Sequence, residues 1–287
     1  MNVKILKYCF IGLLPLLALR AVAQEIIIDG ETARQKVIRP WGRDTVDRSR
    51  LKFIYEQTEV DTVLGFSQDG FCILEVGRAF SKYNDYNDYR ADSLMRTRDW
   101  DFTLGEWYAF TNKHLSVFKP DIVCDMKRGK YTVNTNLLMD FCQYSDSTAR
   151  FAWTICPDTM TICGYACRKA EATFRGRQWT AWYAPGIPLS IGPWKLNGLP
   201  GLIVRADDAD GTHHMELVAT QKADGEVMDY AVNGRIKMTR ERFLQKEKRF
   251  CTQGDTYESA VPLPFRDAGG GELPKARRRF YAPYELE

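Results

Sequence analysis

The sequence predicts a mainly β protein, built from antiparallel strands with a few helices. Runs rich in aromatic and β-branched residues, bounded by Gly, Pro or Asp, are typical of strands. Turn residues between runs, at Pro157-Asp158 and Gly176-Arg177, favour chain reversals between neighbouring strands. The predicted strands are 51–59, 71–77, 151–156, 165–174, 178–184, 201–206 and 213–220.

Two segments favour helices. Residues 81–96 are polar and Tyr-rich, and predict either a helix or an ordered loop. Residues 239–250 predict a helix more clearly, because Thr239 is a suitable N-cap. No domain boundary stands out, so we expect a single β-rich domain over residues 24–287. The apolar side of the second helix comprises Phe243, Leu244 and Phe250.

The N-terminus is typical of an export signal. Lys4 and Lys7 precede an apolar stretch over residues 8–19, and Ala21-Val22-Ala23 then supplies small residues for a signal peptidase. We therefore expect cleavage after Ala23 and a periplasmic or secreted protein. No later stretch is long and apolar enough to span a bilayer.

The charge balance argues against nucleic-acid binding. The whole chain has 40 basic and 37 acidic residues, and residues 1–23 contain three of the bases and no acid. Cleavage would leave 37 of each, whereas a nucleic-acid surface needs a net basic face. We interpret the local basic cluster as a solvated tail following a flexible loop from Asp267. The cluster comprises Lys275, Arg277, Arg278 and Arg279.

Seven cysteines follow the export signal, enough for three disulfides in an oxidising compartment. Cys156, Cys163 and Cys167 are the candidates that lie closest together in sequence. Cys163 and Cys167 would sit ~13 Å apart on one strand, so they would need partners elsewhere. Disulfides or buried thiols are favoured over metal or redox use.

Strand alternation indicates which side chains are buried. In 178–184, Trp179 and Tyr183 share one face with Ala181, and Trp182 lies on the other face. Both faces carry an aromatic residue, so we expect both to be covered. Arg168 falls in an otherwise apolar row of 165–174, which favours a position at the rim.

The stretch 192–203 is rich in Gly and Pro. Pro200-Gly201 suits the centre of a type II turn leading into the next strand. The preceding loop is predicted to press Trp194 and Leu199 into the core, or else to line a pocket.

This stretch resembles the GLPGLI family, whose name matches Gly198, Leu199, Pro200, Gly201, Leu202 and Ile203. The upstream blocks Gly164–Ala170, Phe174–Arg177 and Ala181–Tyr183 are also similar to that family, and the likeness is best over 150–206. It implies secreted Bacteroidota proteins without an agreed function. A more distant likeness to a bowl-shaped domain of secreted glycoamidases implies a curved sheet or open half-barrel.

Motifs for catalysis or metal binding are weak. Adjacent residues on a strand face opposite sides, so His213 and His214 cannot jointly bind one metal ion. Residues 207–211 resemble the start of a calcium loop but lack its later ligands, which favours a turn. There is no G-x-S-x-G, H-E-x-x-H or P-loop sequence.

We therefore expect non-catalytic binding of an apolar or amphipathic ligand, or a role in envelope assembly, without a cofactor. A glycan or an envelope protein is an alternative partner. Alternatives are a hydrolase with an unrecognised site, and metal or thiol handling through Cys163, Cys167 and His213. The candidate ligand contacts are Trp179, Trp182, Tyr183, Trp194 and Arg168.

Overall fold

The computed structural model describes residues 30–35, 42–99, 101–137, 140–148, 151–253 and 278–287. The predicted signal peptide and its cleavage position lie outside these residues, as do Lys275 and Arg277 of the basic cluster. Among the described residues, no helix is long and apolar enough to cross a bilayer.

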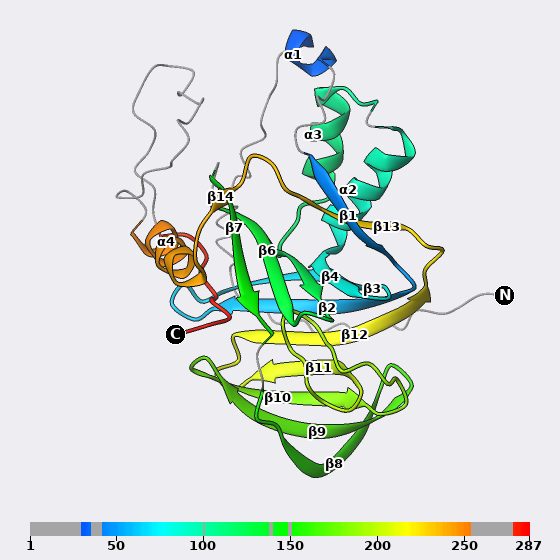
Figure 1. The fold of residues 1–287 in the computed structure, drawn as a ribbon. Coiled ribbons are helices and arrows are strands. Elements are labelled where there is room, and N and C mark those ends of the chain that lie inside the picture. The colour runs from blue at the N-terminus through cyan, green and yellow to red at the C-terminus, as the bar shows by residue number, and fades with distance from the viewer. Residues whose placement is uncertain (1–29, 36–41, 100, 138–139, 149–150, 254–277) are drawn as a thin grey trace, which may run out of the picture.

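Twelve strands form one large open sheet, which confirms the mainly β prediction (Figure 1). The order is β14-β7-β6-β5-β4-β3-β2-β12-β11-β10-β9-β8, with antiparallel neighbours except for the parallel pair β14–β7. The strands are β2 (Leu51–Asp61), β3 (Phe66–Val76), β4 (Phe80–Asp85), β5 (Asp121–Asp125), β6 (Lys130–Leu137), β7 (Asp140–Ser147), β8 (Thr154–Ile162), β9 (Tyr165–Phe174), β10 (Arg177–Ala184), β11 (Leu202–Asp208), β12 (His213–Lys222) and β14 (Ile236–Lys237).

A two-stranded ribbon and four helices complete the described fold. The ribbon pairs β1 (Arg43–Arg48) with β13 (Val227–Ala231). Helices α1 (Gly30–Arg34), α2 (Tyr86–Thr97) and α3 (Leu104–Lys113) lie at one end, and α4 (Arg240–Thr252) lies beside β7 (Figure 1). The helix predicted from residue 239 is confirmed, with the Thr239 hydroxyl accepting a hydrogen bond from the Arg242 amide. The earlier helical segment begins only at Tyr86, because residues 80–85 form β4.

The predicted turn at Pro157-Asp158 is wrong. These residues lie within β8, where the pairing with β9 shifts between Ile155 and Thr159. Proline is tolerated in an edge strand at such an irregularity, because the backbone there is not paired and needs no N–H donor. The chain instead reverses at Cys163 and Gly164, both in the left-handed region. The predicted reversal at Gly176 is confirmed.

The loop before β11 is buried, as the sequence predicts, but its turn differs. Trp194 and Leu199 both lie in the core. Gly201 has φ of +157°, far from the value of a type II turn, and its amide donates to the Leu199 carbonyl. Glycine is required here because an added Cβ would lie 2.3 Å from the Ala184 carbonyl oxygen.

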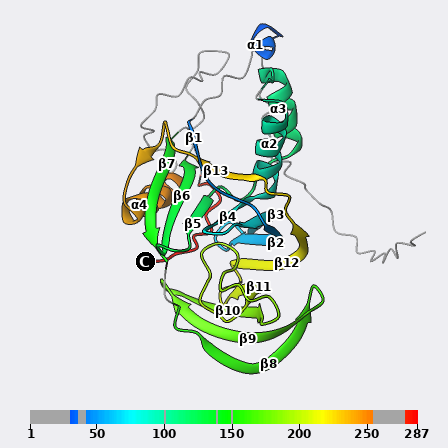
Figure 2. The same cartoon turned by 45° about the vertical axis from the view of Figure 1, so that its right-hand side comes forward.

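Residues 278–287 cross the inside of the bend in the sheet, between β5–β7 and β10–β12 (Figure 2). The ring of Tyr284 stacks on His213 of β12 and on Trp194, at centroid distances of 3.9 and 5.0 Å. The next residue, Glu285, pairs with Lys195. The concave side of the sheet is therefore filled largely by the chain itself.

The prediction of a solvated basic tail is wrong for its two described residues. Arg278 pairs with the buried Asp61 carboxylate at 3.2 Å. Arg279 lies over the Phe250 ring, and its guanidinium donates to the Phe250 carbonyl. Both residues fix the start of the C-terminal segment against the sheet and α4.

Candidate functional site

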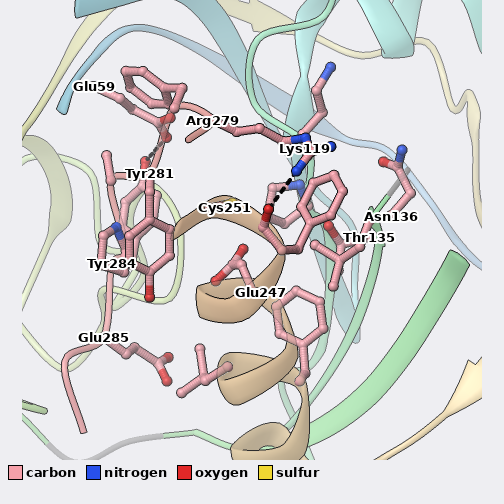
Figure 3. Close-up of a pocket in the computed structure, with 18 of the residues that line it drawn as sticks. Glu59, Lys119, Thr135, Asn136, Glu247, Cys251, Arg279, Tyr281, Tyr284 and Glu285 are labelled. Carbon is pink, nitrogen blue, oxygen red and sulfur yellow. Dashed lines mark hydrogen bonds between the residues drawn. The ribbon is translucent and has the colours of Figure 1, made fainter. Parts of the chain in front are cut away.

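A pocket of about 370 Å³ remains between α4, the C-terminal segment and the inner side of the sheet (Figure 3). It falls within the usual size of small-molecule sites. Its wall combines aromatic rings with three carboxyl groups. The rings belong to Tyr144, Trp194, Phe243, Phe250, Phe280, Tyr281 and Tyr284, and the carboxyl groups to Glu59, Glu247 and Glu285.

Glu247 projects from α4 into the pocket (Figure 3). It shares the inward side of the helix with Phe243 and Cys251, four residues before and after it, which both lie in the buried interior. Among the described residues, Glu247 has no hydrogen bond or ion pair. An acid thus occupies the apolar side of an amphipathic helix without a partner, which is costly unless something else compensates it.

The surroundings of Glu247 favour its neutral form. Burial raises the pKa of its carboxyl group to about 7, and the nearby Glu59 and Glu285 carboxyl groups raise it further against the opposing effect of Lys195. Part of the side chain remains accessible through the pocket, but the enclosing chain shields it from bulk water. Glu247 therefore changes charge close to neutral pH.

This pKa predicts a pH-dependent effect of the substitution Glu247→Gln. A raised carboxyl pKa favours the folded state below about pH 4.5, and that advantage is lost as the pH rises through about 7. Glutamine does not titrate, so the variant should be more stable than the wild type by about 3 kcal/mol at pH 8 and nearly equally stable at pH 4.5. Urea unfolding at the two pH values measures the difference. A difference that does not change with pH would contradict the assignment.

Glu59, in contrast, is fully engaged. Its carboxylate accepts hydrogen bonds from the Tyr284 hydroxyl at 2.8 Å and from the amides of Gln57 and Gln68 at 3.1 and 2.9 Å. Burial raises the pKa of this carboxyl group, and the three donors oppose the shift. Glu59 therefore fixes the position of Tyr284 at the pocket wall.

Glu285 is the centre of a buried ion cluster. Its carboxylate pairs with Lys195 at 2.8 Å, with Arg175 at 2.7 Å and with Arg240 at 2.6 Å. Asp146 of β7 also pairs with Lys195 and Arg175, at 3.0 and 2.7 Å. Burial opposes the ionised form of Asp146, but the two cations lower its pKa to about 2. The cluster joins the C-terminal segment to β7, α4 and the loop before β11.

The structure brings one of the five sequence-predicted contacts to this pocket. Trp194 lines it, whereas Trp179 and Tyr183 are wholly buried in the core behind. Trp182 is half-buried on the other face of β10, so that face is covered only in part. Arg168 is exposed, as expected for the rim.

The cysteines do not form the predicted disulfides. The seven cysteines of the described residues all carry free thiols. Cys167 is buried in β9, in line with the alternative of a buried thiol, whereas Cys163 is exposed at a turn and Cys156 lies in the irregular part of β8. The ring of His213 stacks on the rings of Trp179 and Tyr284. In the described part of the chain, no three His, Cys, Asp or Glu residues are placed to hold a metal ion.

The two adjacent histidines face opposite sides, as the strand alternation predicts. His213 is buried, and burial lowers its pKa to about 3, so its ring is neutral. His214 is half-buried, and its Nδ1 lies 2.5 Å from the Asp207 carboxylate. A turn joins β11 to β12, with the Asp208 carboxylate accepting the amides of Thr212 and His213.

Sequence comparison identifies a short match. Residues 173–205 match the family described as "Protein of unknown function (Porph_ging)", a Bacteroidota-type family. This match does not confirm the GLPGLI name, which stays a resemblance. No curated protein matches the chain.

Structure comparison finds similar chains among solved structures. Two are the structures of PNGF-II in the P21 and C2 space groups, each 14% identical in sequence, with TM-scores of 0.46 and 0.45. Each alignment covers 69% of this chain and 32% of that chain. The aligned region is therefore about a third of the PNGF-II length.

Proposed function

We propose that this protein binds a small amphipathic molecule in the pocket beneath α4, with the polar end of the molecule against Glu247. The observation that carries the proposal is an acid without a described partner inside an aromatic pocket. Ligand sites commonly combine an apolar wall with a few placed polar groups that fix orientation. The rings supply apolar contact, and the Glu247 carboxyl group supplies the polar anchor.

Several residues of the wall are held in fixed positions, which indicates a binding site and not a packing defect. Tyr284 is held by its stacking partners and by Glu59, and Glu285 is held by three cations. A wall fixed in this way is preorganised, so binding does not have to order it. The export sequence at residues 1–23 supports a periplasmic or secreted place for this binding.

The proposal predicts that a neutral amphiphile binds and that filling the pocket blocks it. The probe is 4-phenylbutanol, followed by isothermal titration calorimetry and by chemical-shift changes in the protein. Leu244→Trp adds bulk at the pocket wall, and we expect at least a tenfold loss of affinity. The control is Gln245→Trp, at an exposed position of the same helix, which should leave the affinity unchanged.

Two results would contradict the proposal. One is the absence of any saturable binding to the wild-type protein. The other is equal binding by the Leu244→Trp and Gln245→Trp variants, since that would place the probe elsewhere. A circular dichroism spectrum and an unfolding curve for each variant establish that it is folded before the comparison is made.

A further inference from the structure

We infer that the ligand of this pocket is an organic cation, an ammonium group carried on an apolar body. The inference rests on the proposed function and names the chemical class of the ligand. It depends on the charges around Glu247, on the rings of the wall, and on the lack of a cation for Glu247 among the described residues.

The charges that act on Glu247 are mostly negative. Glu59 faces it from β2 and Glu285 from the C-terminal segment, and Lys195 is the one cation with a described effect on it. The charge of Lys195 is already balanced, because its ammonium group pairs with both Glu285 and Asp146. Arg175 and Arg240 also pair with these carboxylates, so the cations of the cluster are committed to Glu285 and Asp146 and none of them pairs with Glu247. A ligand cation would therefore compensate the ionised Glu247 carboxyl group.

The other polar groups at the pocket do not supply a cation for Glu247. Arg279 donates to the Phe250 carbonyl, and Lys119 donates to the Ser116 carbonyl at an exposed position. Neither is among the groups that shift Glu247. The remaining titratable groups of the wall have raised pKa values, mainly through burial, and stay neutral near pH 7. They are Tyr144, Cys251, Tyr281 and Tyr284.

The aromatic wall favours the same class of ligand. A cation near the face of an aromatic ring is attracted by the negative charge of that face. The pocket already shows this interaction: the Lys195 ammonium lies 5.2 Å from the centre of the Tyr144 ring, and the Arg279 guanidinium lies 4.2 Å from that of Phe250. An alkylammonium ligand would gain from both the rings and the Glu247 carboxylate, whereas an anion would be repelled by that carboxylate.

Binding of a cation would be linked to loss of the Glu247 proton. The ammonium group prefers the ionised carboxyl group, so its affinity should rise with pH until Glu247 is fully ionised. With a pKa of about 7, the ionised fraction falls about 30-fold from pH 8 to pH 5.5. A primary alkylamine, like lysine, stays protonated over this range, so the ligand itself contributes no change.

The experiment compares three probes of the same shape: 4-phenylbutylamine, 4-phenylbutanol and 4-phenylbutyrate. Calorimetry at pH 8 should give an affinity for the amine at least tenfold above those for the alcohol and the carboxylate. That preference should fall at least fivefold at pH 5.5. It should disappear in Glu247→Gln and persist in Glu241→Gln, whose carboxyl group lies on the same helix with 67% of its side chain exposed.

The outcomes separate this inference from the proposed function. If the alcohol or the carboxylate binds as tightly as the amine, and Leu244→Trp blocks it, the pocket binds ligands but the cation inference is overturned. If the amine preference survives in Glu247→Gln, the inference is overturned as well. If none of the three probes binds, the proposed function fails and the inference fails with it.

Discussion

Replacing Lys195 with methionine should lower the free energy of unfolding by about 3 kcal/mol. Lys195 is 2% exposed and pairs with two buried carboxylates, Asp146 and Glu285. The substitution removes a buried cationic partner from both carboxylates, while methionine conserves the volume of the side chain. Arg175 and Arg240 still contact the cluster, which keeps the loss below that of an isolated buried pair.

The matched control is Arg205→Met on the outer face of the sheet. Arg205 also pairs with two carboxylates, Asp207 and Glu216, but all three side chains are about a third exposed. Exposed ion pairs contribute little, so we expect a loss below about 1 kcal/mol. Urea unfolding of both variants at pH 7 measures the contrast. Equal losses would mean that the cluster around Glu285 is not buried in solution.

Replacing Tyr284 with alanine should cost about 4 kcal/mol of stability. The ring of Tyr284 is partly buried and packs against the core, where it contacts His213, Trp194 and the edge of Phe118. The substitution removes an aromatic side chain from a packed site and also removes a hydrogen bond to Glu59. Since Tyr284 lines the pocket, the affinity for the amine probe should fall as well.

The milder variant Tyr284→Phe separates the two contributions. It keeps the stacked ring and removes the hydroxyl donor, leaving Glu59 with the amides of Gln57 and Gln68. We expect a loss of about 1 kcal/mol, as for a single hydrogen bond. Chemical denaturation of both variants gives the comparison. If Tyr284→Ala is destabilised by less than 1 kcal/mol, the C-terminal segment does not pack against the sheet in solution.

The strands that alternate clearly could be predicted from the sequence. In 178–184, Trp179 and Tyr183 fall on the buried face because strand side chains alternate. Helix α3 and strand β6 were not predicted, although each has a sequence pattern typical of its structure. Helix α3 begins with a capping box between Thr103 and Glu106. Strand β6 has side chains suited to a buried strand face at every second position: Tyr131, Val133, Thr135 and Leu137.

The pocket could not be predicted in the same way. Its three carboxyl groups come from β2, α4 and the C-terminal segment, at positions 59, 247 and 285, and no local pattern relates residues so distant in sequence. The C-terminal segment has no strand or helix period, and its arginines resemble a solvated tail. One local feature did point to the site: Glu247 interrupts the apolar side of α4, where Phe243 and Cys251 are buried.

The most direct test of the central claim is the pKa of Glu247 itself, measured with and without ligand. A ¹³C NMR titration of the glutamate carboxyl carbons, with Glu247→Gln to assign the signal, follows this group alone. We expect a pKa of about 7 in the free protein and a value at least one unit lower with 4-phenylbutylamine bound. A pKa near 4.5 that does not move on adding the amine would show a solvated carboxylate outside any binding site, and would contradict the proposed pocket.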